Sequence, residues 1–289
     1  DVLGSRGLGD VYKRQLIYFI MKFSVLLSVY NKENPEYLKE SLESVFSQTL
    51  LPSEVVLIKD GPLTDELNKV IDLYTKYYSY LKVFSLADNQ GLGKALNEGL
   101  KHCSFDIVVR MDTDDIAKPK RFEKQLAVLK MYQDVDVVSA WVEEFEKDVS
   151  DIKSVRKLPE FHNAIQKFAK YRNPINHPVA AFRKSAVLSV GSYRHFPLFE
   201  DYYLWVRMLM NGAKFYNIQE SLLYFRFSSK VFKRRGGWKY AINEFRFQKM
   251  LRQLHFISFP QYIRNIFVRF LTRIIPNSLR KFVYKTILR

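Results

Sequence analysis

Residues 107–119 read IVVRMDTDDIAKP, and this stretch sets an apolar run directly against three aspartates. The run at 107–109 is typical of a strand that is buried on both faces. Asp112, Asp114 and Asp115 follow where that strand is expected to end, with Thr113 between the first two. Crowded carboxylates raise each other's pKa values, so a cluster that stays ionised usually has a cation to hold it together.

Two interpretations of this aspartate cluster remain open at this point. Hard divalent ions such as Mg²⁺ or Mn²⁺ take oxygen ligands, commonly carboxylates together with the phosphates of a substrate, which favours a metal bridge to a diphosphate. The structural alternative is that the aspartates cap a helix that begins near Pro119, or solvate a loop. The pattern D-x-D-D by itself does not choose between them.

Apolar strands and amphipathic helices alternate on both sides of the cluster. Strands are predicted at 22–29, 54–61, 81–87, 105–112 and 135–142, with helices around 38–46, 64–79, 92–103 and 119–131. The inner face of the helix at 92–103 is expected to consist of Leu92, Ala95, Leu96, Gly99, Leu100 and Cys103. Strands separated by single helices indicate an α/β fold with a mostly parallel sheet that helices cover on both faces. Right-handed crossovers then bring all strand C-termini to one edge, where such sheets bind ligands. The residues expected there, besides the aspartates, are Ser28, Tyr30, Asn31 and Asp60.

The ends of the chain differ from this pattern. With 289 residues and 47% hydrophobic content, the chain suffices for one large domain or two small ones. Residues 1–20 show no helical or strand period and precede Met21, so we interpret Met21 as the natural start and 1–20 as a non-native or disordered leader, with a signal peptide as the competing interpretation. The single cysteine, Cys103, favours a reducing compartment such as the cytoplasm.

The positive charge of the chain is concentrated in its tail. Residues 230–289 hold fifteen Lys and Arg against one acid, Glu244, so +14 of the formal charge of +16 lies there. Seven apolar residues in the tail follow helical spacing, and three arginines lie off their stripe: Ile263, Ile266, Phe267, Phe270, Leu271, Ile274 and Ile275, with Arg264, Arg269 and Arg273. Such a basic amphipathic helix suits the surface of an anionic membrane, although it could instead pack onto the rest of the chain or a second subunit. No stretch has the roughly 18 uninterrupted apolar residues of a membrane span, so we predict none.

Four motifs in order carry a resemblance to a known family. They are VLLSVYN at 25–31, VVLIKDG at 55–61, NQGLGKALNEGL at 89–100 and VRMDTDDI at 109–116. Together they resemble the nucleotide-binding half of inverting glycosyltransferases of family 2, which have the GT-A fold. The resemblance covers roughly residues 22–229. It implies a catalytic domain at 21–229, with a nucleotide-binding half at 21–118 and an acceptor half at 119–229, followed by a basic helical extension at 230–289.

The resemblance also implies roles for donor-binding residues. Ser28 and Asp60 would contact the nucleotide base, although Lys59 stands where the family usually has a second acid. Three residues match the family's N-x-G-x-x-x-A-x-N motif near the phosphates and ribose of the donor: Asn89, Gly91 and Lys94. A turn followed by an amphipathic helix explains the glycines of this motif equally well. In the D-x-D-D motif, Asp114 and Asp115 would lie nearest the ribose and a Mn²⁺ or Mg²⁺ ion, and Asp112 would support the loop or coordinate directly.

Two segments of the second half add to the resemblance. In EDYYLWVRML at 200–209, a helical apolar face is predicted at Leu204, Trp205, Met208 and Leu209. The segment is similar to the family's E-D-x-x-L-W-x-R segment, which implies that Asp201 is the catalytic base and that Glu200 and Arg207 belong to the same site. Two acids in the first turn of a helix are also favourable to its dipole, which is the structural alternative. HPVAAFR at 177–183 is similar to a second family segment, in which His177 would reach the diphosphate or the acceptor. A lone histidine is more often a hydrogen-bonded core residue.

The sequence therefore predicts a metal-dependent inverting glycosyltransferase. It would move a sugar from a nucleotide-sugar, with UDP-sugars favoured, to a lipid-linked or saccharide acceptor of a surface polysaccharide at the cytoplasmic face of the membrane. A nucleotidyltransferase is the second hypothesis, but it needs no base in the E-D-x-x-L-W segment. A nucleic-acid-binding protein that uses the basic tail is the third, and it would leave the aspartates unexplained.

Overall fold

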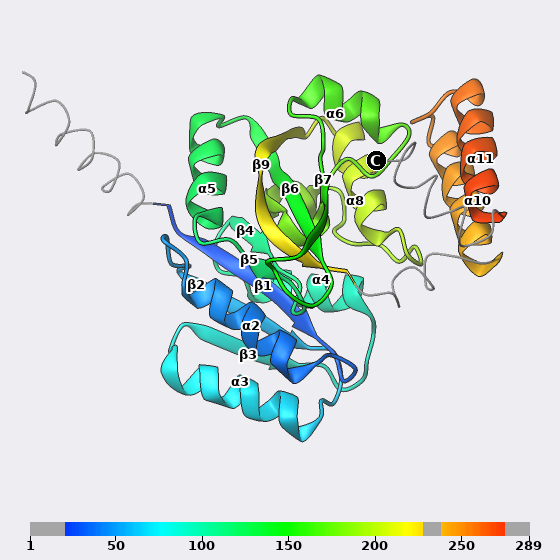
Figure 1. The fold of residues 1–289 in the computed structure, drawn as a ribbon. Helices are drawn as coiled ribbons and strands as arrows, with labels where there is room; N and C mark the ends of the chain where they lie inside the picture. Colours follow the sequence, from blue (N-terminus) through cyan, green and yellow to red (C-terminus); the bar gives the residue numbers. More distant parts are fainter. Residues whose placement is uncertain (1–20, 228–237, 275–289) are drawn as a thin grey trace, which may run out of the picture. The chain divides into compact units, whose positions relative to one another are not determined.

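The computed structural model describes residues 21–227 and 238–274 (Figure 1). The chain forms two compact units. The first unit consists of the described residues up to Gln133 together with Ala181–Lys184, and the second of Asp134–Ala180 with the described residues from Ser185 onward. The predicted leader at 1–20 and the predicted tail segments at 230–237 and 275–289 lie outside the described residues.

The first unit contains a mostly parallel sheet with the strand order β3-β2-β1-β4-β8. β1 (Phe23–Val29), β2 (Glu54–Lys59), β3 (Leu81–Ser85) and β4 (Ile107–Arg110) run parallel, and β8 (Ala181–Arg183) pairs antiparallel with β4. The short strand β5 (Ile116–Ala117) follows the aspartates. The four strands predicted for this part of the chain are therefore confirmed, as is the mostly parallel α/β character.

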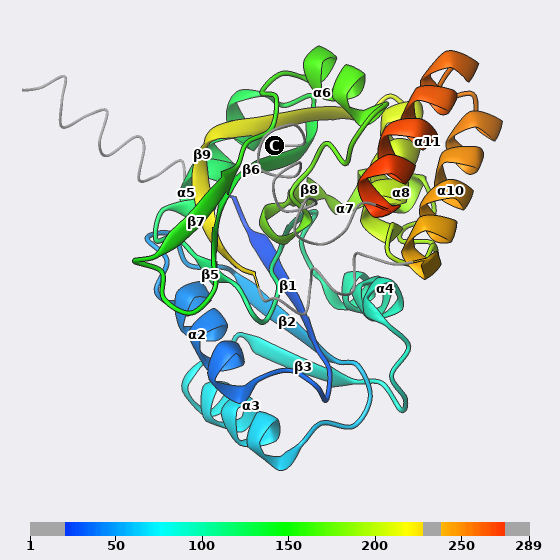
Figure 2. The same ribbon diagram turned by 45° about the vertical axis from the view of Figure 1, so that its right-hand side comes forward.

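Three helices connect the parallel strands, α2 (Pro35–Phe46), α3 (Asp65–Tyr77) and α4 (Leu92–His102), and α5 (Arg121–Met131) follows β5. Figure 2 shows α4 on one side of the strands and α2 and α3 on the other. α4 approaches closely, because a Cβ at Gly99 would lie 2.3 Å from the Cδ1 atom of Leu26. Its predicted inner face is buried, except that Leu92, the first helical residue, is 44% exposed, so that part of the prediction is wrong.

The second unit is built around β6 (Val135–Phe145), which pairs antiparallel with β7 (Ile152–Arg156) and parallel with β9 (Lys214–Arg226). The 3-10 turn η1 spans His177–Val179, and the helices are α6 (His162–Ala169), α7 (Lys184–Ser189), α8 (Glu200–Met210), α10 (Trp238–Gln253) and α11 (Phe259–Ile274). The predicted apolar face of α8 is confirmed, because Leu204, Trp205, Met208 and Leu209 are all buried.

The last helix has a defined start. The amide of Ser258 donates to Gln261 Oε1 at 2.9 Å, and the amide of Gln261 donates to Ser258 Oγ at 3.4 Å, which is a reciprocal capping box. Within residues 21–227 and 238–274, no helix combines the length and the apolar character that crossing a membrane requires.

Candidate active site

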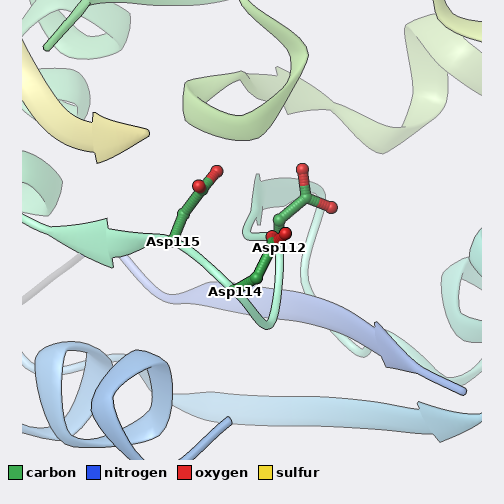
Figure 3. A group of neighbouring side chains, drawn as sticks. All are labelled: Asp112, Asp114 and Asp115. Atoms are coloured by element: carbon green, nitrogen blue, oxygen red, sulfur yellow. The ribbon is translucent and has the colours of Figure 1, made fainter. Parts of the chain in front are cut away.

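The three aspartates predicted as a cluster do lie together. Figure 3 shows Asp112, Asp114 and Asp115 on the turn between β4 and β5, and one carboxylate oxygen from each lies within 4.8 Å of the others. Asp115 is fully buried, and the other two are half-buried. The N-cap of α5 is Lys120, with no side-chain hydrogen bond to the cap, so the capping interpretation is wrong. Burial of Asp115 is also at odds with a merely solvated loop.

Two buried arginines lie next to the aspartates. Arg110, the last residue of β4, is 1% exposed and forms a bidentate ion pair with Asp112. Arg121, the first residue of α5, is fully buried and donates to the backbone oxygen of Arg110 and to Gln125 Oε1. Burial, followed by repulsion from Arg110, lowers the pKa of Arg121 to about 9, so the Arg121 guanidinium is charged at neutral pH.

Negative charge nevertheless exceeds positive charge at this turn. Burial raises the pKa of Asp114 to about 7, and the charges of Asp112 and Glu33 add to the rise, while Arg110 opposes it. Glu33 accepts a hydrogen bond from Thr113 Oγ1 at 2.9 Å. Four carboxylates and two guanidinium groups leave a deficit of two positive charges when all are ionised. A hard divalent cation with oxygen ligands fits this excess of charge.

The other residues predicted for this edge follow the neighbouring parallel strands. Thr113 Oγ1, which donates to Glu33, also lies 3.4 Å from the backbone oxygen of Ser28, and the amide of Asp60 donates to the backbone oxygen of Val29, at 2.8 Å. Ser28 is half-buried, and Tyr30 and Asn31 after it are exposed. The edge formed by β1, β2 and β4 thus carries the aspartate cluster, the turn after β1 and Asp60.

Asp60 joins two of the sequence motifs. Its Oδ1 accepts the Gln90 amide at 2.7 Å and its Oδ2 accepts the Gly91 amide at 3.0 Å, while Asn89 Nδ2 donates to the Asp60 backbone oxygen at 3.2 Å. The carboxylate therefore anchors the loop before α4, a role that the sequence motifs did not indicate. Each oxygen keeps a second lone pair, so a contact to a nucleotide base stays a prediction.

Lys59 and Lys94 differ in their surroundings. Lys59, which stands in place of a second acid, donates to Asn68 Oδ1 on α3 at 2.8 Å. Lys94 is exposed on the first turn of α4, and the N-cap of this helix is Gly91, which offers no capping side chain. A helix N-terminus that has no side-chain cap is suited to bind phosphate.

In the second unit, Glu200 and Asp201 begin α8 as predicted. Asp201 Oδ1 accepts the Tyr202 amide at 2.7 Å, and Asp201 Oδ2 accepts Asn173 Nδ2 at 2.6 Å. Asn173 in turn accepts the Ile175 amide, at 3.3 Å, through its Oδ1. Burial, followed by the charge of Asp201, raises the pKa of Glu200. Asn173 was missed in the sequence, where its only signal is its place before Pro174 in an extended segment.

Arg207 and His177 make structural contacts. Arg207 donates to the backbone oxygens of Val190 and Ser192, and its guanidinium lies 4.6 Å from the ring centre of Tyr203. His177 is buried, and its Nε2 lies 2.8 Å from the hydroxyl of Tyr193. The environment of His177 is that of a hydrogen-bonded core residue. Roles of either residue in substrate binding stay predictions.

Comparison with known proteins identifies the family. The model of "Glycosyl transferase family 2" matches residues 24–191. A UDP-Gal:alpha-D-GlcNAc-diphosphoundecaprenol beta-1,3-galactosyltransferase from Escherichia coli is 44% identical over 93% of this chain and 97% of its own length. The amylovoran biosynthesis glycosyltransferase AmsE from Erwinia amylovora is 40% identical over 91% of this chain and 98% of its own.

Solved structures agree in fold. The mannosyltransferase PcManGT from Pyrobaculum calidifontis, determined with GDP-Man and Mn²⁺, aligns with a TM-score of 0.63 and 14% identity over 91% of this chain and 77% of its own. This likeness confirms the predicted GT-A fold class. With the family match and the relatives that align over nearly their whole length, it follows that this chain belongs to glycosyl transferase family 2 and is a glycosyltransferase.

Proposed function

We propose that the chain transfers a sugar, with inversion, from a UDP-sugar to a hydroxyl of a lipid-linked saccharide during synthesis of a surface polysaccharide. The observation that carries this proposal is the end-to-end similarity to a galactosyltransferase whose name states a UDP-Gal donor and a GlcNAc-diphosphoundecaprenol acceptor. UDP-galactose is therefore the first donor to test.

The donor is assigned to the first unit. Ser28, Tyr30, Asn31 and Asp60 lie at the C-terminal edge of the parallel strands, where such sheets bind ligands. Asn89 and Gly91 belong to the loop that Asp60 anchors. This loop leads into the N-terminus of α4, which has no side-chain cap and is therefore suited to bind phosphate. Lys94, exposed one turn into α4, would add a positive charge beside the diphosphate.

The aspartate cluster is assigned to a divalent cation, Mn²⁺ or Mg²⁺. Asp114 and Asp115 would hold the ion, and Asp112, which is engaged with Arg110, would orient the turn or add a third ligand. When bound, such an ion neutralises charge that develops on the departing diphosphate. The excess negative charge around Asp114 supports this assignment.

The acceptor chemistry is assigned to the second unit. A sugar hydroxyl is a weak nucleophile at neutral pH, so Asp201 would take its proton as the oxygen attacks the anomeric carbon. The hydrogen bond from Asn173 would hold the Asp201 carboxylate in one orientation. One in-line displacement breaks the bond between sugar and diphosphate and inverts the anomeric centre. Glu200, Arg207 and His177 would shape the surroundings of this base.

The proposed location is the cytoplasmic face of a membrane. A polyprenol-linked acceptor resides in the bilayer, so the enzyme must act at its surface. The excess of +14 within residues 230–289 supports attraction to anionic lipids.

Turnover of nucleotide-sugars by the full chain tests the proposal. UDP-galactose is incubated with a synthetic GlcNAc-diphosphate lipid, with and without Mn²⁺, beside UDP-GlcNAc, GDP-mannose and a dTDP-sugar. We expect UDP release and a disaccharide-lipid product with one donor, and neither after EDTA treatment. A nucleotidyltransferase would instead release pyrophosphate from a nucleoside triphosphate and a sugar 1-phosphate, and a nucleic-acid-binding protein would turn over none of these donors.

A glycine pair tests whether the loop anchored by Asp60 binds the donor. Gly61 and Gly212 have φ values of +85° and +87°, but a Cβ at Gly61 would lie 2.6 Å from the Asn89 backbone nitrogen, whereas nothing lies within 4 Å of one at Gly212. Both alanine variants incur the left-handed strain of about 1–2 kcal/mol, and Gly61→Ala must also displace the loop at 88–89. We therefore expect Gly61→Ala to cost at least about 3 kcal/mol in the free energy of unfolding and to weaken UDP-sugar binding at least about tenfold.

Urea unfolding and titration calorimetry measure the two effects. Gly212→Ala should bind the donor as the unmodified chain does. Equal donor affinity in both variants would remove the Asn89 loop from the donor site.

A further inference from the structure

Polar contacts determine which side of α11 faces the rest of its unit. Asn265 is buried, and its Nδ2 donates to the Lys170 backbone oxygen at 2.8 Å and to Gln248 Oε1 on α10 at 2.9 Å. One turn later, Arg269 donates to the Tyr171 backbone oxygen and forms an ion pair with Glu244 of α10. The side of α11 that packs against its own unit is therefore its polar side.

The apolar side of the helix consequently points to solvent. Phe259, Ile263 and Phe267 follow one another at intervals of four residues and are 59%, 49% and 64% exposed. A surface helix of a globular protein normally buries such a stripe and exposes its polar side. In α11 the arrangement is reversed. Rotation of the helix about its axis to bury the apolar side would separate Asn265 and Arg269 from their hydrogen-bond and ion-pair partners.

α10 extends this exposed apolar surface. Ile242 and Phe245, one turn apart on α10, are also about half exposed, and the ring of Phe245 lies 6.4 Å from that of Tyr262 on α11. The Tyr262 ring lies equally close to Phe259. Figures 1 and 2 both show α10 and α11 side by side. We call Ile242, Phe245, Phe259, Ile263 and Phe267 the outer apolar row.

The charge around this row indicates what covers it. Residues 238–274 contain seven Lys and Arg against a single acid, Glu244, which is already paired with Arg269. A second copy of this chain would bring the same positive charge to the interface and be repelled. An anionic lipid surface attracts the arginines and lysines and accepts the aromatic and aliphatic side chains between its headgroups.

We propose that the outer apolar row is the membrane-contact surface of the enzyme, with α10 and α11 lying in the headgroup region of an anionic bilayer. The proposal rests on the proposed action on a lipid-linked acceptor and names the part of the chain that meets the lipid. It differs from the expectation for the basic tail in two respects. On α11, Phe259 joins Ile263 and Phe267 of the predicted stripe, and α10 adds Ile242 and Phe245.

Sedimentation of the full chain with vesicles tests this surface. The vesicles are phosphatidylcholine alone or phosphatidylcholine with phosphatidylglycerol, and the variant is Phe259→Ser with Ile263→Ser and Phe267→Ser. We expect the unmodified chain to bind the anionic vesicles and the triple variant to lose at least about tenfold in partition coefficient, because three apolar side chains no longer leave water. All basic residues remain, so charge alone does not account for a loss.

The matched control places three serines on other exposed apolar residues, Leu73, Met131 and Leu188. It should bind anionic vesicles as the unmodified chain does, and circular dichroism checks the folding of both triple variants. Binding by the row variant at the unmodified level would overturn the proposal, as would a dimer in analytical ultracentrifugation that only the row variant dissociates while vesicle binding persists. Vesicle binding needs no turnover, so failure of sugar transfer with every donor would reject the proposed function separately.

Discussion

Replacement of Asp201 by asparagine is expected to lower kcat for sugar transfer at least about 1,000-fold, with UDP-sugar affinity unchanged. The amide keeps the size of the side chain, and its one oxygen can still accept the hydrogen bond from Asn173, but the bond from the Tyr202 amide is then lost. Circular dichroism therefore checks that the variant keeps its fold. What it loses is the capacity to take a proton from the acceptor hydroxyl. Single-turnover transfer to the lipid-linked acceptor and calorimetric binding of the donor separate the two quantities.

Glu200→Gln is the matched control for this experiment. Glu200 precedes Asp201 in the same helical turn and carries the same charge, and burial raises its pKa. If Asp201 is the base, Glu200→Gln should retain at least about a tenth of kcat. The substitution changes the electrostatic field around Asp201 but leaves the proton acceptor in place. Transfer by Asp201→Asn at a comparable level, or a larger loss in Glu200→Gln, would move the base role away from Asp201.

The fold was predictable because its signals are local. The four parallel strands of the first unit are short segments rich in apolar residues, and the helices between them have a buried stripe at helical spacing, so period and length sufficed to place them. β8, with three residues, was not predicted. The error at Leu92 has a physical cause. Leu92 is the first residue of its helix, so no preceding helical turn lies beside its side chain to cover it. β5, with two residues, is too short to carry a periodic signal.

The candidate site was predictable only in part. The aspartate cluster could be located because parallel strands bring their ends to one edge. The contacts that orient these acids depend on three-dimensional neighbours. Glu33 meets Thr113 across 80 residues of sequence, and Asn173 meets Asp201 across 28, and no periodicity encodes such pairs. Arg110 did offer a signal, since a charged residue that ends an apolar strand usually has a buried partner.

Asp114→Asn is expected to weaken the response to metal while stabilising the metal-free protein. Burial raises the pKa of Asp114 from 3.8 to about 7, with Asp112 and Glu33 adding to the effect. Because the folded pKa exceeds the unfolded one, ionisation of Asp114 costs stability, and this cost grows as pH rises from about 4 through 7. A neutral asparagine avoids the cost, so its unfolding midpoint should exceed that of the unmodified chain at pH 8 and equal it near the unfolded pKa.

With Mn²⁺ present, the unmodified chain should have the higher unfolding midpoint of the two. The cation neutralises the crowded carboxylates of the unmodified chain and raises its midpoint, whereas the variant, which lacks one charged ligand, should respond weakly and lose at least about 100-fold in kcat/KM. Asp112→Asn is the informative control, because it removes the partner of the buried Arg110 and should cost about 3 kcal/mol in the free energy of unfolding at neutral pH. The two substitutions should therefore change the free energy of unfolding in opposite directions. The reason is that Asp112 neutralises a buried cation, whereas Asp114 adds to an excess of negative charge. Stabilisation of Asp114→Asn by Mn²⁺ to the same degree as the unmodified chain would show that Asp114 is no ligand.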